Sequence, residues 1–389
     1  MKVLLISHTC QSRAEGQRKA EQIARLPGIE LLVLAPQRFN HYGVWRDAEP
    51  PEGADFAFTA RPVRWPWLGP AQNYLHWYPA LRQILTEFQP DVIDLWEEPW
   101  ALVSAHACWL RNRLLPHTRI VMESEQNLHK RFPPPFAQLE AYVIAQADHA
   151  VGRSREVLEV LRAKGYQGPA SVVGNAVDTA LFRPLDRAAC RRALGWTEFT
   201  VGYVGRLVER KGLLDAVEAL AVCPPSVRLV FVGSGELRPA LDAHIAALGL
   251  GARVEFLDAR PLEALPPVMN ALDALLLPSR TVPSWKEQFG RVIIEAQACG
   301  TPVLGSDSGA IPEVVAGGGL IFPEGDAAAL AAAIVRLKDA PAERQQLGAT
   351  GLRQVEERST WARVAAQMHG IYTTFNRRAA AVPQVPAHV

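Results

Sequence analysis

Short, mainly apolar runs recur along the whole chain, and they constrain its fold more than any other feature. The first is VLLIS at residues 3–7, and similar runs lie at 29–36, 91–99 and 119–125. A run of this length without polar alternation is typical of a strand buried on both faces of a parallel sheet. Stretches rich in helix formers separate the runs. The sequence therefore predicts an α/β fold with doubly wound parallel sheets.

The runs form two series, which indicates two domains. A turn-rich segment, NAVDTALFRPLD at residues 175–186, separates the first series from the second. The second series comprises runs at 200–207, 227–235, 253–259, 273–279, 301–307 and 319–322. The chain length of 389 residues also favours two domains. Because ligands of open parallel sheets bind beyond the carboxyl ends of strands, we expect a ligand in a cleft between the domains.

The predicted boundaries follow from this division. We expect a first Rossmann-like domain over residues 1–175 and a second over residues 176–359. A last helix over residues 360–376 is predicted to pack back on the first domain. The tail over residues 377–389 is predicted to be disordered.

Composition excludes several classes of function. The net charge is +1, which argues against general nucleic-acid binding because that function requires a strongly basic face. The five cysteines are scattered and never form a C-x-x-C pair, so neither a disulfide framework nor a zinc site is expected. No apolar stretch reaches the roughly 18 residues of a membrane span, and the first apolar run is too short for a signal peptide. We expect a cytoplasmic protein.

The segment GYVGRLVERKGL at residues 202–213 brings two cations to a strand end and a helix start. Gly205 makes the turn, and Arg206 and Lys211 flank it. Fixed cations near backbone N–H groups and a helix dipole suit an anion. The segment lacks the GxxxxGK[ST] pattern of a P-loop. Two alternatives remain open at this point, an anion site or two solvated cations on a loop.

The segment KEQFGRVIIEAQACG at residues 286–300 carries two glutamates around a glycine turn. Gly290 lets a ligand approach the backbone at a helix start. Glu295 lies five residues further, roughly 7 Å along the helix axis, so its carboxylate could accept from ribose hydroxyls. Glu287 could accept from hydroxyls of a second sugar. Alternatively, Glu287 is a solvated loop acid and Glu295 a helix-face acid, although the apolar neighbours of Glu295 weaken that alternative.

These motifs resemble the family 4 glycosyltransferases, the retaining group 1 enzymes of the GT-B superfamily. VGNAVDTALFRP is similar to the family's interdomain segment, GYVGRLVERKG to its diphosphate loop, and EQFGRVIIE to its E-x7-E signature. The resemblance implies a GT-B fold, in which residues 1–175 form the acceptor-side domain and residues 176–359 the nucleotide-sugar donor-binding domain. It also implies transfer of a sugar, with retention, from a UDP- or GDP-sugar to a hydroxyl acceptor, in polysaccharide or glycoconjugate biosynthesis.

The resemblance also implies roles for single residues. Arg206, Lys211 and Glu287 would form the catalytic group, with both cations on the diphosphate and Glu287 on the donor sugar. The donor-binding set would be Gly205, Phe289, Gly290, Arg291, Val292, Glu295 and, beside the base, Leu257. No metal or other cofactor is implied, because the nucleotide-sugar is a co-substrate.

The first domain departs from the family pattern. Many members of the family have a Gly-Gly loop after the first strand, whereas the loop here contains a single glycine, Gly16. Many also have a histidine after a central strand, where this sequence has the segment VMESEQNLHK. That segment offers Glu123, Glu125, Asn127 and His129, and the preceding strand ends in Glu97-Glu98-Pro99. The acceptor-side candidates are Gly16, Glu98, Glu125 and Asn127. The acids among them could instead be plain loop acids.

Tryptophan is concentrated in the first part of the chain. RPVRWPWLGPAQNYLHWYPALRQIL at residues 61–85 mixes aromatic rings with arginines. Such a surface suits sugar stacking or peripheral contact with an anionic membrane, at the inner membrane face, whereas the alternative is that the rings fill the core. The expected partners are a nucleotide-sugar donor and a glycan, glycolipid or small-molecule acceptor, without nucleic acid. Rival hypotheses are a sugar-nucleotide epimerase and a non-catalytic sugar-nucleotide binding module.

Overall fold

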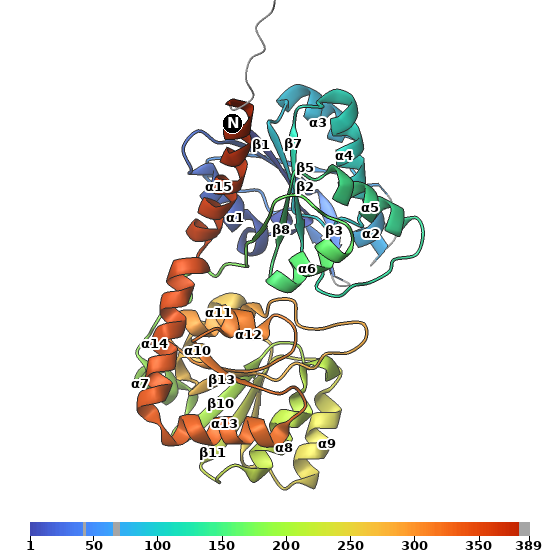
Figure 1. Ribbon diagram of the computed structural model, residues 1–389. Coiled ribbons are helices and arrows are strands. Elements are labelled where there is room, and N and C mark those ends of the chain that lie inside the picture. Colours follow the sequence, from blue (N-terminus) through green and yellow to red (C-terminus); the bar gives the residue numbers. More distant parts are fainter. Residues whose placement is uncertain (42–43, 65–70, 381–389) are drawn as a thin grey trace, which may run out of the picture. The chain divides into compact units, whose positions relative to one another are not determined.

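A computed structural model describes residues 1–41, 44–64 and 71–380 (Figure 1). The chain divides into two compact units. The first unit comprises Met1–Val173 together with Trp361–Val389, and the second comprises Gly174–Thr360. The first unit is therefore assembled from both ends of the chain, and the second from its middle.

The first unit contains a seven-stranded parallel sheet in the order β5-β2-β1-β6-β7-β8-β9. Its strands are β1 (Lys2–Ile6), β2 (Glu30–Pro36), β5 (Ala57–Arg61), β6 (Val92–Leu95), β7 (Arg119–Ser124), β8 (His149–Gly152) and β9 (Ala170–Val172). Val3 pairs with Leu31 on one side and with Val92 on the other, so β1 is a central strand. Leu4 and Leu5 are fully buried on opposite faces, as the unbroken apolar run predicts.

Helices cover both faces of this sheet. They are α1 (Arg18–Ala24), α2 (Gln72–Leu75), α3 (Leu81–Phe88), α4 (Leu102–Leu114), α5 (Phe136–Gln146), α6 (Arg155–Ala163) and α15 (Trp361–Ala380). α1 and α15 lie side by side (Figure 1). α3 to α6 share a core with Leu4 and Ile6 on the other face. α15 extends to Ala380, so residues 377–380 of the predicted disordered tail are helical instead, while residues 381–389 lie outside the described ranges.

A short antiparallel hairpin was absent from the predicted pattern. It pairs β3 (Arg38–His41) with β4 (Val44–Asp47). Both strands carry polar and charged residues, so neither produces the apolar run that marks the buried strands. The edge strand β5 was also not predicted, because its residues are partly buried or exposed and form no apolar run.

The second unit contains a six-stranded parallel sheet in the order β12-β11-β10-β13-β14-β15. Its strands are β10 (Phe199–Val204), β11 (Val227–Val232), β12 (Val254–Leu257), β13 (Ala274–Leu277), β14 (Val303–Ser306) and β15 (Gly319–Phe322). α8 (Leu213–Val222), α9 (Arg238–Ala247) and α13 (Ala327–Asp339) pack together. The other helices are α7 (Arg187–Leu194), α10 (Pro266–Ala271), α11 (Arg291–Ala298), α12 (Ile311–Val315) and α14 (Pro341–Arg358). Each unit is thus a Rossmann-like, doubly wound domain.

Each sheet has one point at which the strand order reverses. In the first unit the chain runs from β1 outward through β2 and β5, then returns to place β6 on the other side of β1. In the second unit it runs from β10 through β11 and β12, then returns to place β13 beside β10. The loops that leave the two strands at a reversal diverge, and ligands of such sheets bind between them.

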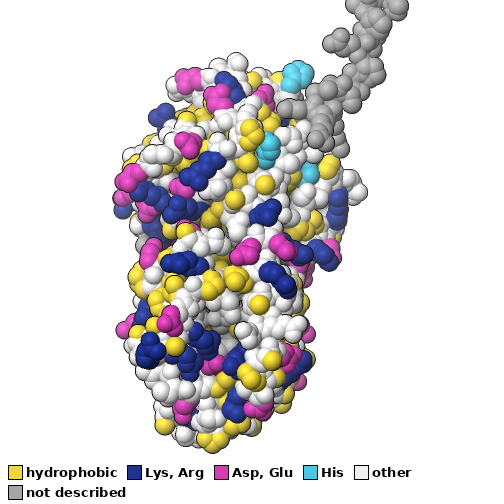
Figure 2. Space-filling model, turned by 90° about the vertical axis from the view of Figure 1, so that its left-hand side faces the viewer, with side chains coloured by type: hydrophobic (Ala, Val, Ile, Leu, Met, Phe, Trp, Pro, Cys, Tyr) yellow, Lys and Arg dark blue, Asp and Glu magenta, His cyan; other side chains and the backbone are white. Residues whose placement is uncertain are grey.

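Charge is evenly mixed on the visible surface. Figure 2 shows Lys and Arg side chains interspersed with Asp and Glu over the face that it displays. This distribution matches the net charge of +1.

Candidate functional site

The strand-order reversal of the second unit is formed by two interlocked loops. The loop after β10 leads to the short 3-10 turn Glu209–Lys211, and the loop after β13 leads to α11. The two loops approach each other closely at Gly212. Its φ is 63°, and an added Cβ would lie 1.9 Å from the carbonyl oxygen of Pro278, so only glycine allows this contact. The backbone N–H of Arg280 also donates to the carbonyl of Arg210 at 2.9 Å. The predicted cation loop is therefore held directly against the loop that carries Glu287.

Lys211 and Glu287 lie together at this reversal. Lys211 Nζ is 2.5 Å from Glu287 Oε2, and the hydroxyl of Ser279 donates to the same oxygen at 2.8 Å. Glu287 is 6% exposed. The indole of Trp285 lies 4.8 Å from Lys211 Nζ, so the ammonium group is fixed by a carboxylate and an aromatic face. Glu287 is therefore not a solvated loop acid.

Arg206 differs from Lys211 because its side chain is exposed. Its carbonyl oxygen accepts from the hydroxyl of the buried Tyr203 at 2.8 Å, which fixes the backbone at the end of β10. Within the described ranges, the guanidinium of Arg206 forms no hydrogen bond or ion pair. It is a cation that a ligand can reach.

The start of α11 supplies the predicted donor-binding backbone. The helix begins at Arg291, and Gly290 caps it with a φ of 78°. An added Cβ at Gly290 would lie 2.9 Å from Leu277 Cδ2, so glycine is required. Arg291 is exposed and Val292 half-buried at this N-terminus. Phe289 is buried in the core of the second unit, so its side chain is turned away from solvent.

Glu295 lies in the middle of α11 with no hydrogen bond or ion pair from the part of the chain that is described. Burial raises the pKa of its carboxyl group, and the charge of Arg291 offsets this in part. A half-buried carboxylate without a partner costs free energy, because it has lost part of its hydration. A ligand whose hydroxyl groups donate hydrogen bonds to Glu295 would offset that cost.

Leu257, the residue predicted beside the base, ends β12 at the same edge of the sheet. Its carbonyl oxygen accepts from the N–H of Gly233 at 3.0 Å, and its side chain is half-buried. The carbonyl oxygen of Leu257 is thus already engaged by Gly233, which leaves only its second lone pair for a ligand.

The strand-order reversal of the first unit holds a histidine that the sequence prediction missed. His8 follows β1, and Glu97 follows the neighbouring strand β6. Glu97 Oε1 accepts from the backbone N–H of His8 at 2.6 Å, and Glu97 Oε2 lies 2.7 Å from His8 Nδ1. A histidine directly after the first buried strand is the signal that would have identified this pair.

The four acceptor-side candidates lie around the same edge but play different parts. Gly16 packs tightly, since an added Cβ would lie 2.4 Å from the backbone of Thr9. Glu98 accepts from the Ser124 hydroxyl at 2.8 Å and from the Glu125 N–H at 2.7 Å, so it fixes the end of β7. Burial raises the pKa of Glu98 to about 7, despite these hydrogen bonds.

The other two candidates follow β7. Glu125 is 42% exposed at its side chain, where Arg153 Nε lies 3.2 Å from its Oε1. Asn127 is 2% exposed and donates to Glu156 of α6 at 3.1 Å. Among the four, Glu125 is therefore the side chain that presents the most surface to a ligand.

Glu123, a further candidate from the sequence, is instead part of a buried ion network. Its carboxylate pairs with Lys19 and, at 2.5 Å, with Arg153 Nη2. Asp94 Oδ2 lies 3.7 Å from Lys19 Nζ and accepts from the Tyr372 hydroxyl of α15 at 2.6 Å. Burial, together with the neighbouring Glu123, raises the pKa of Asp94. At 1% exposure, Glu123 is structural rather than a ligand contact.

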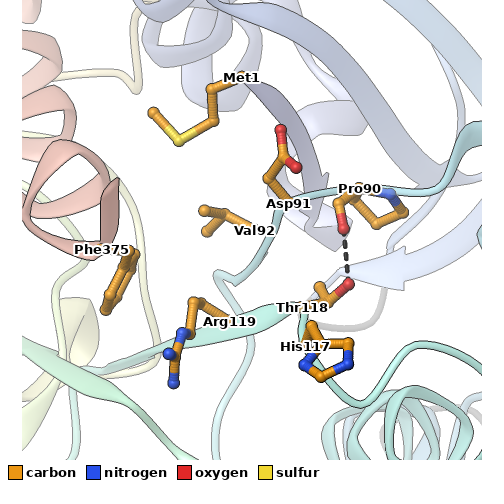
Figure 3. A pocket seen from close by; sticks show the side chains of 8 residues that line it. All are labelled: Met1, Pro90, Asp91, Val92, His117, Thr118, Arg119 and Phe375. Carbon is orange, nitrogen blue, oxygen red and sulfur yellow. Dashed lines mark hydrogen bonds between the residues drawn. The ribbon is translucent and has the colours of Figure 1, made fainter. Parts of the chain in front are cut away.

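A pocket of about 310 Å³ lies at the opposite, amino-terminal ends of β1, β6 and β7 (Figure 3). Three of its polar side chains, those of Asp91, Thr118 and Arg119, already have partners in the protein. Asp91 Oδ2 accepts from the Lys2 N–H at 2.7 Å, the Thr118 hydroxyl donates to the Pro90 carbonyl at 2.6 Å, and Arg119 pairs with Asp148. This pocket therefore lies at the opposite end of the sheet from the strand-order reversal of the first unit.

Comparison with known proteins identifies the family. The model for glycosyl transferases group 1 matches residues 186–354, and the model for glycosyltransferase family 4 matches residues 21–181. The D-inositol 3-phosphate glycosyltransferase of Stackebrandtia nassauensis is 34% identical over 314 residues, which cover 73% of this chain and 69% of that relative. The chain belongs to the family 4 glycosyltransferases.

Other relatives of this glycosyltransferase have related names. The D-inositol 3-phosphate glycosyltransferase of Segniliparus rotundus is 31% identical, over 72% of this chain and 66% of its own length. A GDP-mannose-dependent monoacylated alpha-(1-6)-phosphatidylinositol monomannoside mannosyltransferase of Corynebacterium glutamicum is 33% identical, over 48% of this chain and 51% of its own length.

Solved structures confirm the GT-B fold of the glycosyltransferase. Sucrose-phosphate synthase from Thermosynechococcus elongatus matches with a TM-score of 0.74 and 22% identity, over 97% of this chain and 100% of that one. Anabaena HepE in complex with UDP matches with a TM-score of 0.73 and 21% identity, over 96% and 100% of the two chains. In the part of the chain that the structure describes, no helix is long and apolar enough to cross a membrane.

Proposed function

We propose that this glycosyltransferase moves a sugar, with retention, from a UDP- or GDP-sugar to a hydroxyl acceptor. The observation that carries the proposal is the cluster at the strand-order reversal of the second unit. Lys211, Glu287 and Ser279 are joined there by contacts of 2.5 and 2.8 Å, beside the exposed cation Arg206. Two cations suit a diphosphate, and a carboxylate beside them suits the hydroxyl groups of the attached sugar.

In the proposed reaction, charge develops on the leaving diphosphate. The acceptor oxygen forms a bond to the anomeric carbon on the face that the leaving group departs from, while the bond from that carbon to the diphosphate oxygen breaks. The diphosphate leaves with the electron pair and takes the acceptor proton. Arg206, Lys211 and the N–H groups at the start of α11 stabilise the developing charge. Because these groups take the role that a metal ion could have, we predict that the reaction needs no metal.

Glu287 and Glu295 have complementary roles in this proposal. Lys211 and Glu287 neutralise each other before the donor binds. When the diphosphate engages Lys211, Glu287 becomes available to accept from sugar hydroxyls. Glu295 accepts from the ribose hydroxyls, which gives its half-buried carboxylate the hydrogen bonds that the described residues do not supply.

The acceptor class is a glycan, glycolipid or small molecule, and the role lies in polysaccharide or glycoconjugate synthesis. Relatives named for D-inositol 3-phosphate and for a phosphatidylinositol mannoside make inositol-containing acceptors the first to examine. A sugar-nucleotide epimerase would convert its substrate without an acceptor, and a binding module would release no nucleotide.

The test is a donor screen followed by an assay of nucleotide release. UDP-glucose, UDP-N-acetylglucosamine and GDP-mannose are compared for the rise in melting temperature, since a ligand that binds the folded state stabilises it. The best donor is then incubated with D-inositol 3-phosphate, phosphatidylinositol, maltotriose or no acceptor. We expect acceptor-dependent release, and a smaller thermal shift in the matched variant Glu295→Gln. Stabilisation without nucleotide release from any mixture would contradict a transferase.

We further propose peripheral contact with an anionic membrane, at the inner membrane face of a cytoplasmic enzyme. Residues 65–70 of the tryptophan-rich segment lie outside the described ranges. An aromatic and basic cluster nearby supports the proposal: Trp77 contacts His106, His106 stacks on Trp109, and the Arg113 guanidinium lies 4.2 Å from the Trp109 ring. Trp109 is 44% exposed, whereas Trp100 packs against the core.

We expect the enzyme to sediment with vesicles that contain an anionic phospholipid at low salt, and less so at high salt. The variant Trp109→Ala/Arg113→Ala should sediment less, because it removes one exposed ring and one cation. Neutral phosphatidylcholine vesicles are the control. Equal recovery in the supernatant with both vesicle types would rule out this contact.

A further inference from the structure

His8 and Glu97 occupy, in the first unit, the place that Lys211 and Glu287 occupy in the second. Both pairs follow the two strands at which the strand order of their sheet reverses. Ile6 of β1 is paired with Leu95 of β6, and the N–H of Trp96 donates to the Ile6 carbonyl at 3.1 Å, so the two strand ends are level. Ligands of doubly wound sheets bind at this point.

Glu97 fixes both the backbone and the ring of His8. One carboxylate oxygen accepts the His8 backbone N–H, and the other lies 2.7 Å from Nδ1. Burial alone would raise the pKa of Glu97, but the charges and hydrogen bonds of His8 and His76 hold it at about 2. The carboxylate is therefore ionised at neutral pH and can only accept, so Nδ1 must carry a proton.

The position of the imidazole ring is also determined by its aromatic neighbours. It stacks on the buried ring of Phe39 with a centroid distance of 5.0 Å and an interplanar angle of 28°. The ring of His76 meets it edge-on at 6.3 Å. His8 is 24% exposed at its side chain whereas Glu97 is 2% exposed, so the imidazole rather than the carboxylate meets the solvent.

Acidic groups surround His8 on several elements. Burial lowers the pKa of His8, but the charge and hydrogen bond of Glu97 and the charges of Glu125 and Glu15 together raise it above its ordinary value. His76 is the basic group on this side, with its Nε2 at 3.7 Å from Glu97 Oε1. The raised pKa of His8 increases the share of the imidazolium form, in which both ring nitrogens donate.

We infer that His8, oriented by Glu97, binds the acceptor by donating a hydrogen bond from Nε2 to an acceptor oxygen next to the attacking hydroxyl. This inference rests on the proposed transfer reaction. His8 touches the acceptor, and Glu97 is a positioning residue that acts through His8. The attacking hydroxyl keeps its own proton for the diphosphate, so His8 determines acceptor affinity rather than the chemical step.

The test compares His8→Ala, His8→Gln and Glu97→Gln with the wild type, using the acceptor of the panel above that the wild type turns over. We expect His8→Ala to raise the KM for the acceptor roughly tenfold or more, as for loss of a charged hydrogen bond, with a smaller effect on kcat. His8→Gln should recover part of the loss because its amide donates. Thermal stabilisation by the donor should be unchanged in all three variants.

The pH profile distinguishes binding by His8 from a merely structural role. The KM for the acceptor should rise as pH rises through the pKa of His8, because the neutral ring no longer donates from Nε2. In Glu97→Gln this rise should occur at lower pH, since loss of the carboxylate lowers the pKa of His8. His117→Gln is the matched control, because His117 is an exposed histidine of the same unit beside the pocket in Figure 3.

An unchanged KM for the acceptor in His8→Ala, with an active wild type, would overturn the inference. A pH profile that is identical in the wild type and in Glu97→Gln would also overturn it. If the wild type turns over none of the acceptors, the proposed function fails, and the inference fails with it.

Discussion

Replacing Arg206 with alanine should lower kcat by about 10²- to 10³-fold, the usual cost of removing one group that stabilises developing charge. Because the side chain is exposed and has no partner among the described residues, the variant should fold normally, with a melting temperature close to that of the wild type. Arg206→Lys should lie between the two, since lysine keeps the charge but loses the planar fork of donors. The measurement is nucleotide release at saturating donor and acceptor.

Arg192 offers a matched control for this variant. It is an exposed arginine of α7 and does not belong to the cluster around Glu287. Arg192→Ala should leave kcat unchanged. If the kcat of Arg206→Ala lies within about twofold of the wild-type value, Arg206 does not stabilise the transition state and does not belong to the catalytic group.

Replacing Glu123 with alanine should have the largest effect on stability. Lys19 and Arg153 are 1% and 3% exposed, and both depend on this carboxylate for charge compensation. Leaving buried charges without their partner typically costs about 3–5 kcal/mol. For a unit of this size such a loss lowers the melting temperature by roughly 10 °C, which differential scanning calorimetry would measure.

An exposed ion pair of the same unit provides the comparison. Arg38 and Asp47 lie 3.8 Å apart across the β3–β4 hairpin, with side chains 64% and 81% exposed. Asp47→Ala should change the free energy of unfolding by less than about 1 kcal/mol. Similar melting temperatures for Glu123→Ala and Asp47→Ala would mean that solvent reaches the Lys19 and Arg153 charges.

The residues proposed to bind the donor were easier to place from the sequence than those of the first unit. Arg206, Lys211, Glu287 and Glu295 lie within short distances along the chain of a strand end or a helix start, where local pattern alone predicts their direction. The structure adds what spacing cannot supply. Lys211 and Glu287 are 76 positions apart, and only the folded loops reveal that they pair with each other.

The first unit was harder to interpret because its important contacts join distant segments. Glu98 looked like a ligand contact, yet it is engaged by Ser124 and Glu125, 26 and 27 positions away. Glu123 was a candidate acid, but Lys19, 104 positions earlier, neutralises it in the core. His8 was overlooked because its partner Glu97 lies 89 positions further on. A lone acid or histidine in a sequence carries no information about such partners.

Helix α15 makes the order of synthesis relevant to folding. It is the last helix of the described chain, yet it packs on α1, and its Tyr372 hydroxyl is bonded to Asp94 in the centre of the first unit. On the ribosome, residues 174–360 can therefore form a complete unit while the first unit still lacks one of its covering helices. Until α15 has been synthesised, the face of β1 that carries Val3 and Leu5 lacks this helix as its cover, and that apolar surface is exposed on the nascent chain.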